Sequence, residues 1–347
     1  MVPKFRDSSS LKKLRLMSLP PKKQYGFRVF VCSCIFTTVT IALVLWDERR
    51  QRERRQEGVK KERTSVFGST MLITTGLMGG RGTVRLIAAK PTMDLLRFAG
   101  SFPLINNKWK PDTVYLYQFP RSPVLPNLSP FCLKVETFLR VNGIKYEVIG
   151  TFRKYRSSRG LLPFIELNGK RIEDSQVIIW ELQKHFKLED GLTGSERGTA
   201  RALERMVDVS TFYAMLYDKS VINAPAFMSR AVTGIPLPAF LSNWLAKRFS
   251  ETIRKRVNGV LGGLPREDLK ELLRRDIRAI DDILQDKKFL FGGKMTVTDC
   301  AVFGQLSTTF FLPYRQLITD LLEDEFPRVR HYLQRIRRHY YPEWKDE

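Results

Sequence analysis

The sequence is poor in the residues that build disulfide frameworks and metal sites. Its 347 residues include four cysteines and three histidines, and none of them stand in a CxxC or HxxxH spacing. Four cysteines are too few to staple a chain of this length, which excludes the small disulfide-rich secreted class. Without paired ligands at metal-binding spacing, we expect no zinc site and no metal cofactor.

Acidic residues are scarce relative to basic ones. The chain carries 59 Lys and Arg against 36 Asp and Glu, a formal net charge of +23. More than half of this excess lies in the first 100 residues, which also contain a hydrophobic segment and a second, weaker apolar stretch (66–80) that is too short to span a bilayer. A nucleic-acid-binding protein would show a basic stripe interleaved with stacking aromatics, or a recognisable motif, and the sequence has neither. We therefore expect attraction to a membrane surface and no nucleic-acid partner.

Residues 29–46 form a hydrophobic run without a formal charge. Its 18 residues are at the lower limit of length for a helix that crosses a bilayer. A cleaved signal peptide and a buried core helix are the alternatives, but the run is followed by DERRQRERRQ instead of a small-residue cleavage site. The segment is interpreted as a single-pass membrane anchor, between a basic tail (1–28) and a juxtamembrane linker (47–109).

Charge does not decide the orientation of this anchor. Residues 1–28 and 47–63 each contain eight Lys or Arg, so the positive-inside rule gives a tie. Two cysteines later in the chain, Cys132 and Cys300, suit a reducing compartment. We expect the later domains to face the cytoplasm, and the basic, acid-poor N-terminus leaves the mitochondrial outer membrane open as the location.

Residues 110–190 are expected to form an α/β domain. Strand and helix patterns follow one another at 113–119 (strand), 131–142 (helix), 145–149, 164–167 and 170–173 (strands) and from 175 onward (helix). The last two strands flank Asn168-Gly169, a strong hairpin signal, and Ser175 is expected to cap the final helix. A β-α-β unit followed by a hairpin and a helix predicts a thioredoxin-like layer.

The rest of the chain, residues 195–342, is expected to be an all-helical domain. Apolar residues recur there at helical spacing, as in ARALERMVDVSTFYAMLY, and no strand-like run comparable to the earlier ones occurs. The Pro- and Gly-rich residues 223–238 and 259–265 are expected to be loops. Thr296 and Asp299 have the spacing of a capping box, in which two side chains bond free backbone N–H groups at a helix start.

Three blocks of this sequence resemble glutathione transferases. Residues 129–147 (SPFCLKVETFLRVNGIKYE) are similar to their first helix and second strand, and residues 162–178 (LPFIELNGKRIEDSQVI) to their later strands and glutathione-holding turn. Residues 289–306 (FLFGGKMTVTDCAVFGQL) are similar to the core helix of their C-terminal domain. A more specific resemblance, to the failed axon connections family, rests on the hydrophobic N-terminal segment, the Ser-Pro-Phe-Cys turn and the short second connection. That metaxin-related branch includes cadmium-responsive nematode relatives.

The resemblance implies candidate catalytic residues at the start of the first helix. Ser129 matches the position whose hydroxyl stabilises the glutathione thiolate, but a serine there also suits an N-cap that needs no ligand. Cys132 is a secondary candidate, because Ser-Pro-Phe-Cys resembles the Cys-Pro-x-Cys turn of glutaredoxins. With serine in place of the attacking cysteine, dithiol exchange cannot run, and Cys132 is interpreted first as a small buried apolar residue.

The resemblance also implies residues that bind glutathione. Leu162 and Pro163 match the cis-proline turn whose backbone pairs with the peptide, and Asp174 with Ser175 matches the acidic-serine pair that holds its γ-glutamyl end. Between residues 149 and 162, however, only GTFRKYRSSRGL remains. Soluble glutathione transferases carry a fuller helical segment there, so this departure argues against a complete glutathione site.

Three functions therefore remain open, because a fold does not determine an activity. The preferred hypothesis is a non-catalytic adaptor that organises protein partners at a membrane. The first alternative is a glutathione transferase that acts on hydrophobic electrophiles, or in metal or oxidative stress, with glutathione as a substrate. The second is a component of mitochondrial outer-membrane import. A homodimer is left open in each case.

Overall fold

The computed structural model describes residues 104–152, 155, 157–158 and 160–344. The expected basic tail, the expected anchor at 29–46 and nearly all of the expected linker lie outside these residues. Within the described part, every helix is either too short or too polar to span a bilayer.

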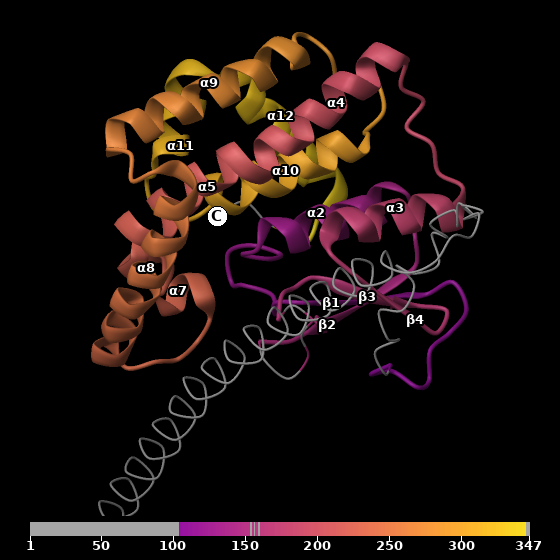
Figure 1. The fold of residues 1–347 in the computed structure, drawn as a ribbon, viewed down its shortest axis with the longest axis horizontal. Helices are drawn as coiled ribbons and strands as arrows, with labels where there is room; N and C mark the ends of the chain where they lie inside the picture. The colour runs from indigo at the N-terminus through magenta and orange to yellow at the C-terminus, as the bar shows by residue number, and fades with distance from the viewer. Residues whose placement is uncertain (1–103, 153–154, 156, 159, 345–347) are drawn as a thin grey trace, which may run out of the picture. The chain divides into compact units, whose positions relative to one another are not determined.

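A four-stranded mixed sheet forms the first layer of the described chain (Figure 1). Its strands are β1 (Val114–Gln118), β2 (Tyr146–Gly150), β3 (Phe164–Leu167) and β4 (Lys170–Glu173), in the order β2-β1-β3-β4. β1 pairs in parallel with β2 and antiparallel with β3, which forms an antiparallel hairpin with β4. The predicted β-α-β unit followed by a hairpin is therefore confirmed.

Two helices cover one face of this sheet (Figure 1). They are α2 (Pro130–Val141) and α3 (Ser175–Phe186). Successive side chains of a strand point to opposite faces, so Val114 and Leu116 of β1 pack in the core beneath the helices. Tyr115 and Tyr117 belong to a second cluster on the other face.

Helices make up most of the remaining described chain. They are α4 (Gly194–Met206), α5 (Phe212–Tyr217), α6 (Ala224–Phe227), α7 (Arg230–Thr233), α8 (Ala239–Leu261), α9 (Arg266–Leu284), α10 (Val297–Phe310), α11 (Leu317–Asp320) and α12 (Pro327–Tyr340), with three π-helical turns, η3 (Val207–Thr211), η4 (Asp218–Ile222) and η5 (Leu321–Glu325). The predicted all-helical C-terminal domain is confirmed.

Two predicted loops of this domain are partly wrong. Residues 223–238 contain the short helices α6 and α7, because Pro225 stands in the first turn of α6, where a proline removes no helical hydrogen bond. Gly259 does not end a helix, since α8 continues to Leu261 and stops at Gly262, whose φ of +72° is the left-handed conformation of a helix C-cap.

The α/β layer, made of the sheet with α2 and α3, meets the helical domain where α10 crosses α2. Gly304 of α10 lies so close that a Cβ built on it would stand 2.8 Å from the Pro130 carbonyl oxygen and 2.9 Å from the Lys134 nitrogen. Only glycine permits such an approach between two backbones. This contact holds the N-terminal end of α2 against the helical domain.

The start of α10 is fixed by the predicted capping box, which the structure confirms. Asp299 Oδ2 accepts hydrogen bonds from the Thr296 backbone N–H and hydroxyl, both at 2.8 Å. Its Oδ1 accepts from the Leu290 N–H at 3.0 Å and from the Tyr332 hydroxyl at 2.9 Å. Because this buried carboxylate is fully hydrogen-bonded, it ties α10 to α12 and to the preceding loop.

Candidate functional site

The candidate residues lie around two neighbouring cavities. The smaller cavity, of about 190 Å³, is lined by Leu162, Pro163, Asp174 and Ser175 among others. The larger cavity, of about 520 Å³, is lined by Ser129 and mainly by apolar side chains of both domains. Residues shared by the two linings are Phe131, Leu161, Leu162 and Arg256. The structure thus brings five of the six predicted site residues to one composite cleft.

Ser129 is the N-cap of α2. Its Oγ accepts a long hydrogen bond of 3.5 Å from the Cys132 N–H, and its own N–H donates to Asn127 Oδ1 at 2.9 Å. Asn127 in turn donates to the Phe119 carbonyl oxygen, which fixes the turn before the helix. Since Oγ acts as an acceptor in the cap, its hydrogen remains available to donate to a ligand at the positive end of the helix. The capping role and the binding role are therefore compatible.

Cys132 does not belong to the cleft. It is fully buried in the cluster with Tyr115, Tyr117 and Phe164, and it is not among the described residues that line either cavity. This surrounding supports the interpretation of Cys132 as a small apolar core residue.

The Leu162–Pro163 peptide bond is cis, as predicted. It stands directly before β3, and both of its residues line the smaller cavity. Leu162 reaches the larger cavity as well, so it forms part of the wall between the two.

Asp174, and not Ser175, caps α3, which corrects the sequence prediction. Its Oδ1 accepts from the N–H groups of Gln176 at 3.0 Å and Val177 at 3.4 Å, whereas Ser175 is already the first residue of the helix. Asp174 has φ +74° and ψ 126°, a conformation that costs a non-glycine residue about 1–3 kcal/mol. In this backbone conformation the Asp174 carboxylate lies against the first turn of α3. Only its Oδ1 accepts hydrogen bonds from described residues, which leaves Oδ2 without a partner among them.

The short connection after β2 is fastened to the edge strand β4. Glu173 accepts hydrogen bonds from the Ser158 N–H at 2.8 Å and from its hydroxyl at 2.5 Å, and it forms an ion pair with Arg171. Ser157, next to this contact, lines the smaller cavity. The described part of the connection therefore forms one wall of that cavity without the helical segment that glutathione transferases carry there.

Two cations of the helical domain face the cleft, and sequence reasoning missed both. Arg256 of α8 lines both cavities, and Lys219 of η4 lines the larger one. Lys219 is 4% exposed, and burial lowers its pKa to about 8. No local pattern marks either residue, because their roles depend on how α8 and η4 fold back towards α2.

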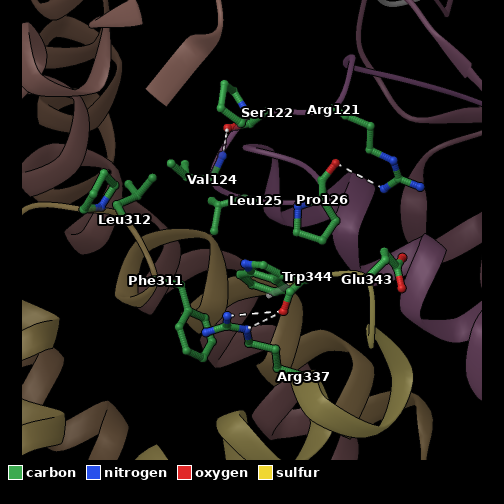
Figure 2. A pocket seen from close by; sticks show the side chains of 12 residues that line it. Arg121, Ser122, Val124, Leu125, Pro126, Phe311, Leu312, Arg337, Glu343 and Trp344 are labelled. Atoms are coloured by element: carbon green, nitrogen blue, oxygen red, sulfur yellow. Dashed lines mark hydrogen bonds between the residues drawn. The ribbon is translucent and has the colours of Figure 1, made fainter. Parts of the chain in front are cut away.

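Another cavity, of about 570 Å³, lies between the loop before α2 and the C-terminal residues (Figure 2). Its arginines are already engaged. Arg121 pairs with the buried carboxylate of Glu136 and donates to the Pro126 carbonyl oxygen, and Arg337 donates twice to the Trp344 carbonyl oxygen. These contacts indicate a structural junction, and the predicted site residues lie elsewhere.

Comparisons with known proteins identify the families and relatives that this chain resembles. Models of the glutathione S-transferase N-terminal and C-terminal domains match residues 130–226 and 273–336. The chain is 31% identical to Failed axon connections of Drosophila melanogaster over 263 residues, which cover 72% of this chain and 63% of that protein. It thus spans less than two thirds of the length of that relative.

Two further proteins are similar. The chain is 28% identical to isoprene-epoxide–glutathione S-transferase of Rhodococcus sp. over 232 residues, which cover 62% of this chain and 94% of that enzyme. A solved structure, glutathione transferase GSTFuA3 from Phanerochaete chrysosporium, has a TM-score of 0.46 at 15% identity and covers 65% of this chain and 97% of its own.

Proposed function

Because the chain belongs to the failed axon connections family of glutathione-transferase-like proteins, we propose that it binds glutathione in the smaller cavity and an apolar electrophile in the larger one. One observation carries this proposal. Ser129 lines the larger cavity, Asp174 and Ser175 line the smaller one, and Leu162 and Phe131 belong to both linings. A peptide held at Asp174 would thus extend its thiol towards Ser129, at the border of the apolar space.

Each residue has a defined task in this proposal. Asp174 Oδ2 accepts from the γ-glutamyl ammonium group, while the N-terminus of α3 at Ser175 attracts the neighbouring carboxylate. Ser129 donates its hydroxyl hydrogen to the thiolate sulfur, and the positive end of α2 favours the same charge. The thiolate sulfur then forms a C–S bond with an electrophilic carbon in the larger cavity, as the bond from that carbon to its leaving group or to the epoxide oxygen breaks. The leaving group departs as an anion, or the epoxide oxygen becomes an alkoxide that takes a proton from water.

The name of the Rhodococcus relative supports an epoxide as one electrophile class, since that protein joins glutathione to isoprene epoxide. The larger cavity suits such molecules, because Phe131, Phe212 and Phe249 are among its apolar walls. Burial of an apolar substrate there contributes about 25 cal/mol for each Å² removed from water.

A non-catalytic adaptor is the second candidate, and α8 supports it. Phe240 is 71% exposed and Trp244 is 40% exposed on this helix, which leaves aromatic surface for a protein partner. In this version the cleft retains ligand binding without turnover.

The proposal also includes a membrane anchor at residues 29–46, with the described domains in the cytoplasm. Release of the full chain from membranes by alkaline carbonate would contradict the anchor.

Calorimetric titration of the full-length protein with glutathione tests the proposal, followed by conjugation of glutathione to styrene oxide. We expect saturable binding and measurable conjugation. Binding without conjugation would favour the adaptor that senses glutathione. Absence of binding would remove glutathione from the function and leave the exposed face of α8 as the main functional surface.

A further inference from the structure

The larger cavity contains a buried cation that the proposed transfer reaction does not use. Lys219 is 4% exposed, and its Nζ makes one long hydrogen bond of 3.5 Å to the Thr308 carbonyl oxygen. Its next contact is the ring of Phe227, whose centroid lies 5.5 Å from Nζ. Among the described residues, no carboxylate forms an ion pair with it. A buried ammonium group without a counter-ion is costly for a folded protein.

Beside it lies a second incomplete polar group. Ser220 is fully buried and lines the same cavity, and its Oγ has no hydrogen-bond partner among the described residues. Buried hydroxyl groups are almost always hydrogen-bonded. Lys219 and Ser220 therefore form a pair of adjacent donors whose hydrogen-bonding capacity the protein itself does not satisfy.

The backbone explains how two consecutive residues reach one cavity. Both belong to η4, a five-residue π-helical turn between α5 and α6. Such turns are rare and occur often at functional sites, because they change the direction of side chains along a helix. α5, α7 and α8 lie together at this end of the helical domain (Figure 1).

The charge of the cavity has a single sign. Among the described residues that line it, the charged ones are Lys219 and Arg256, and both are cations. Most of the other lining residues are apolar, including Phe212, Phe227 and Phe249. The cavity therefore combines a large apolar surface with positive potential and two donors that have unused hydrogen-bonding capacity. Such a cavity complements an amphipathic molecule that has an anionic group and an apolar chain.

We propose that the larger cavity binds amphipathic carboxylates, whose carboxylate accepts hydrogen bonds from Lys219 and Ser220 while the hydrocarbon part packs against the aromatic walls. A carboxylate has two oxygens, one for each donor, and supplies the missing counter-ion. Burial lowers the pKa of Lys219, and the nearby negative charge of a bound carboxylate would offset this effect by favouring the charged ammonium form. This ligand class does not depend on glutathione, so it stands or falls separately from the transferase proposal.

The test uses 4-phenylbutanoate and its uncharged analogue 4-phenylbutan-1-ol, titrated calorimetrically without glutathione into the full chain. The chain is held in phosphatidylcholine nanodiscs, and empty nanodiscs provide the blank. We expect Lys219→Met to weaken binding of the acid by about 30-fold or more, because a buried charge pair loses one partner. We expect Ser220→Ala to weaken it by about fivefold.

Two controls make the result specific. Lys255→Met removes the same charge from an exposed position of α8 outside the cavity lining, and we expect it to leave acid binding unchanged. The alcohol should bind wild type and Lys219→Met with equal affinity, which shows that the cavity is intact in the variant. Equal loss of acid and alcohol binding in Lys219→Met, undiminished acid binding in that variant, or no acid binding by the wild type would each overturn the proposal.

Discussion

Lys134 of α2 and Asp208 of η3 form a buried ion pair, with 2.8 Å between Nζ and Oδ2. Two glutamines complete it, since Lys134 also donates to Gln176 of α3 and Asp208 accepts from Gln305 of α10. The pair therefore joins the α/β layer to the helical domain directly behind the start of α2, where Ser129 lies.

We expect Lys134→Met to destabilise the protein by about 3–5 kcal/mol, because it leaves the Asp208 charge buried without its partner. The double variant Lys134→Met with Asp208→Leu should recover most of this loss, since no charge remains to be compensated. Urea unfolding of both variants measures the difference. A double variant less stable than Lys134→Met would contradict a role limited to mutual charge compensation.

Gly304 offers a test of the contact between α10 and α2. Gly304→Ala should destabilise by about 1–3 kcal/mol, because its Cβ would meet backbone atoms of Pro130 and Lys134 that cannot rotate away. Gly198→Ala on α4 is the matched control. Its Cβ meets no atom within 4 Å, so it should stabilise the helix by about 0.5–1 kcal/mol. Equal effects in thermal unfolding would rule out a close helix contact.

Ser129→Ala separates capping from chemistry. If the hydroxyl supports the thiolate, kcat for conjugation should fall by about 100-fold while KM for glutathione changes little. Stability should fall by about 1 kcal/mol through loss of the cap. Ser129→Thr keeps both the hydroxyl and the cap, so it should retain most activity. Unchanged kcat in Ser129→Ala would leave the residue as a cap alone.

Asp174→Asn separates the charge of this residue from its cap. The amide oxygen can still accept from Gln176 and Val177, and asparagine tolerates positive φ, so stability should change little. Glutathione affinity should fall by about tenfold, because a charge-assisted bond to the ammonium group is lost. Asp174→Ala should lose stability as well. Calorimetry and urea unfolding give the two readouts, and equal glutathione affinity in wild type and Asp174→Asn would exclude an electrostatic role.

Lys219 predicts an unusual dependence of stability on pH. Its pKa is lowered from 10.5 to about 8 by burial, so the unfolded chain binds the proton more tightly than the folded one. Stability should therefore rise with pH between about 8 and 10.5, by about 1–2 kcal/mol from pH 7.5 to 9.5. Lys219→Met should lack this rise and be more stable at neutral pH. Parallel slopes for the two proteins in urea unfolding would show that Lys219 is solvated.

Local signals accounted for much of the fold. Asn168-Gly169 predicted the β3–β4 hairpin because turn geometry depends on the two residues in the turn. The Thr296–Asp299 box depends on a spacing of three residues, so the sequence shows it directly. Ser175 was predicted as a cap because serine is a common residue at a helix start, but Asp174 occupies the cap position one residue earlier. The positive φ of Asp174 cannot be predicted from its residue type.

The cleft itself needed the structure. Ser129, Pro163 and Asp174 were found by resemblance, yet half of the cavity lining beside them comes from residues that follow more than 30 residues later in the chain. Lys219 resembles any solvated lysine in the sequence, and only the packing around η4 buries it. Burial of a polar residue by distant segments leaves no periodic pattern, so such residues escape sequence reasoning.

The bare backbone contact at Gly304 limits how this protein can be divided. The α/β layer and the helical domain are separate in topology. Each supplies one helix of the close contact between α2 and α10, and each supplies one residue of the Lys134–Asp208 ion pair. A fragment that ended near residue 190 would expose to water the α2 backbone that Gly304 now covers, and it would leave Lys134 without its partner Asp208. We therefore expect neither domain to be stable without the other, and the two domains to unfold in one cooperative transition.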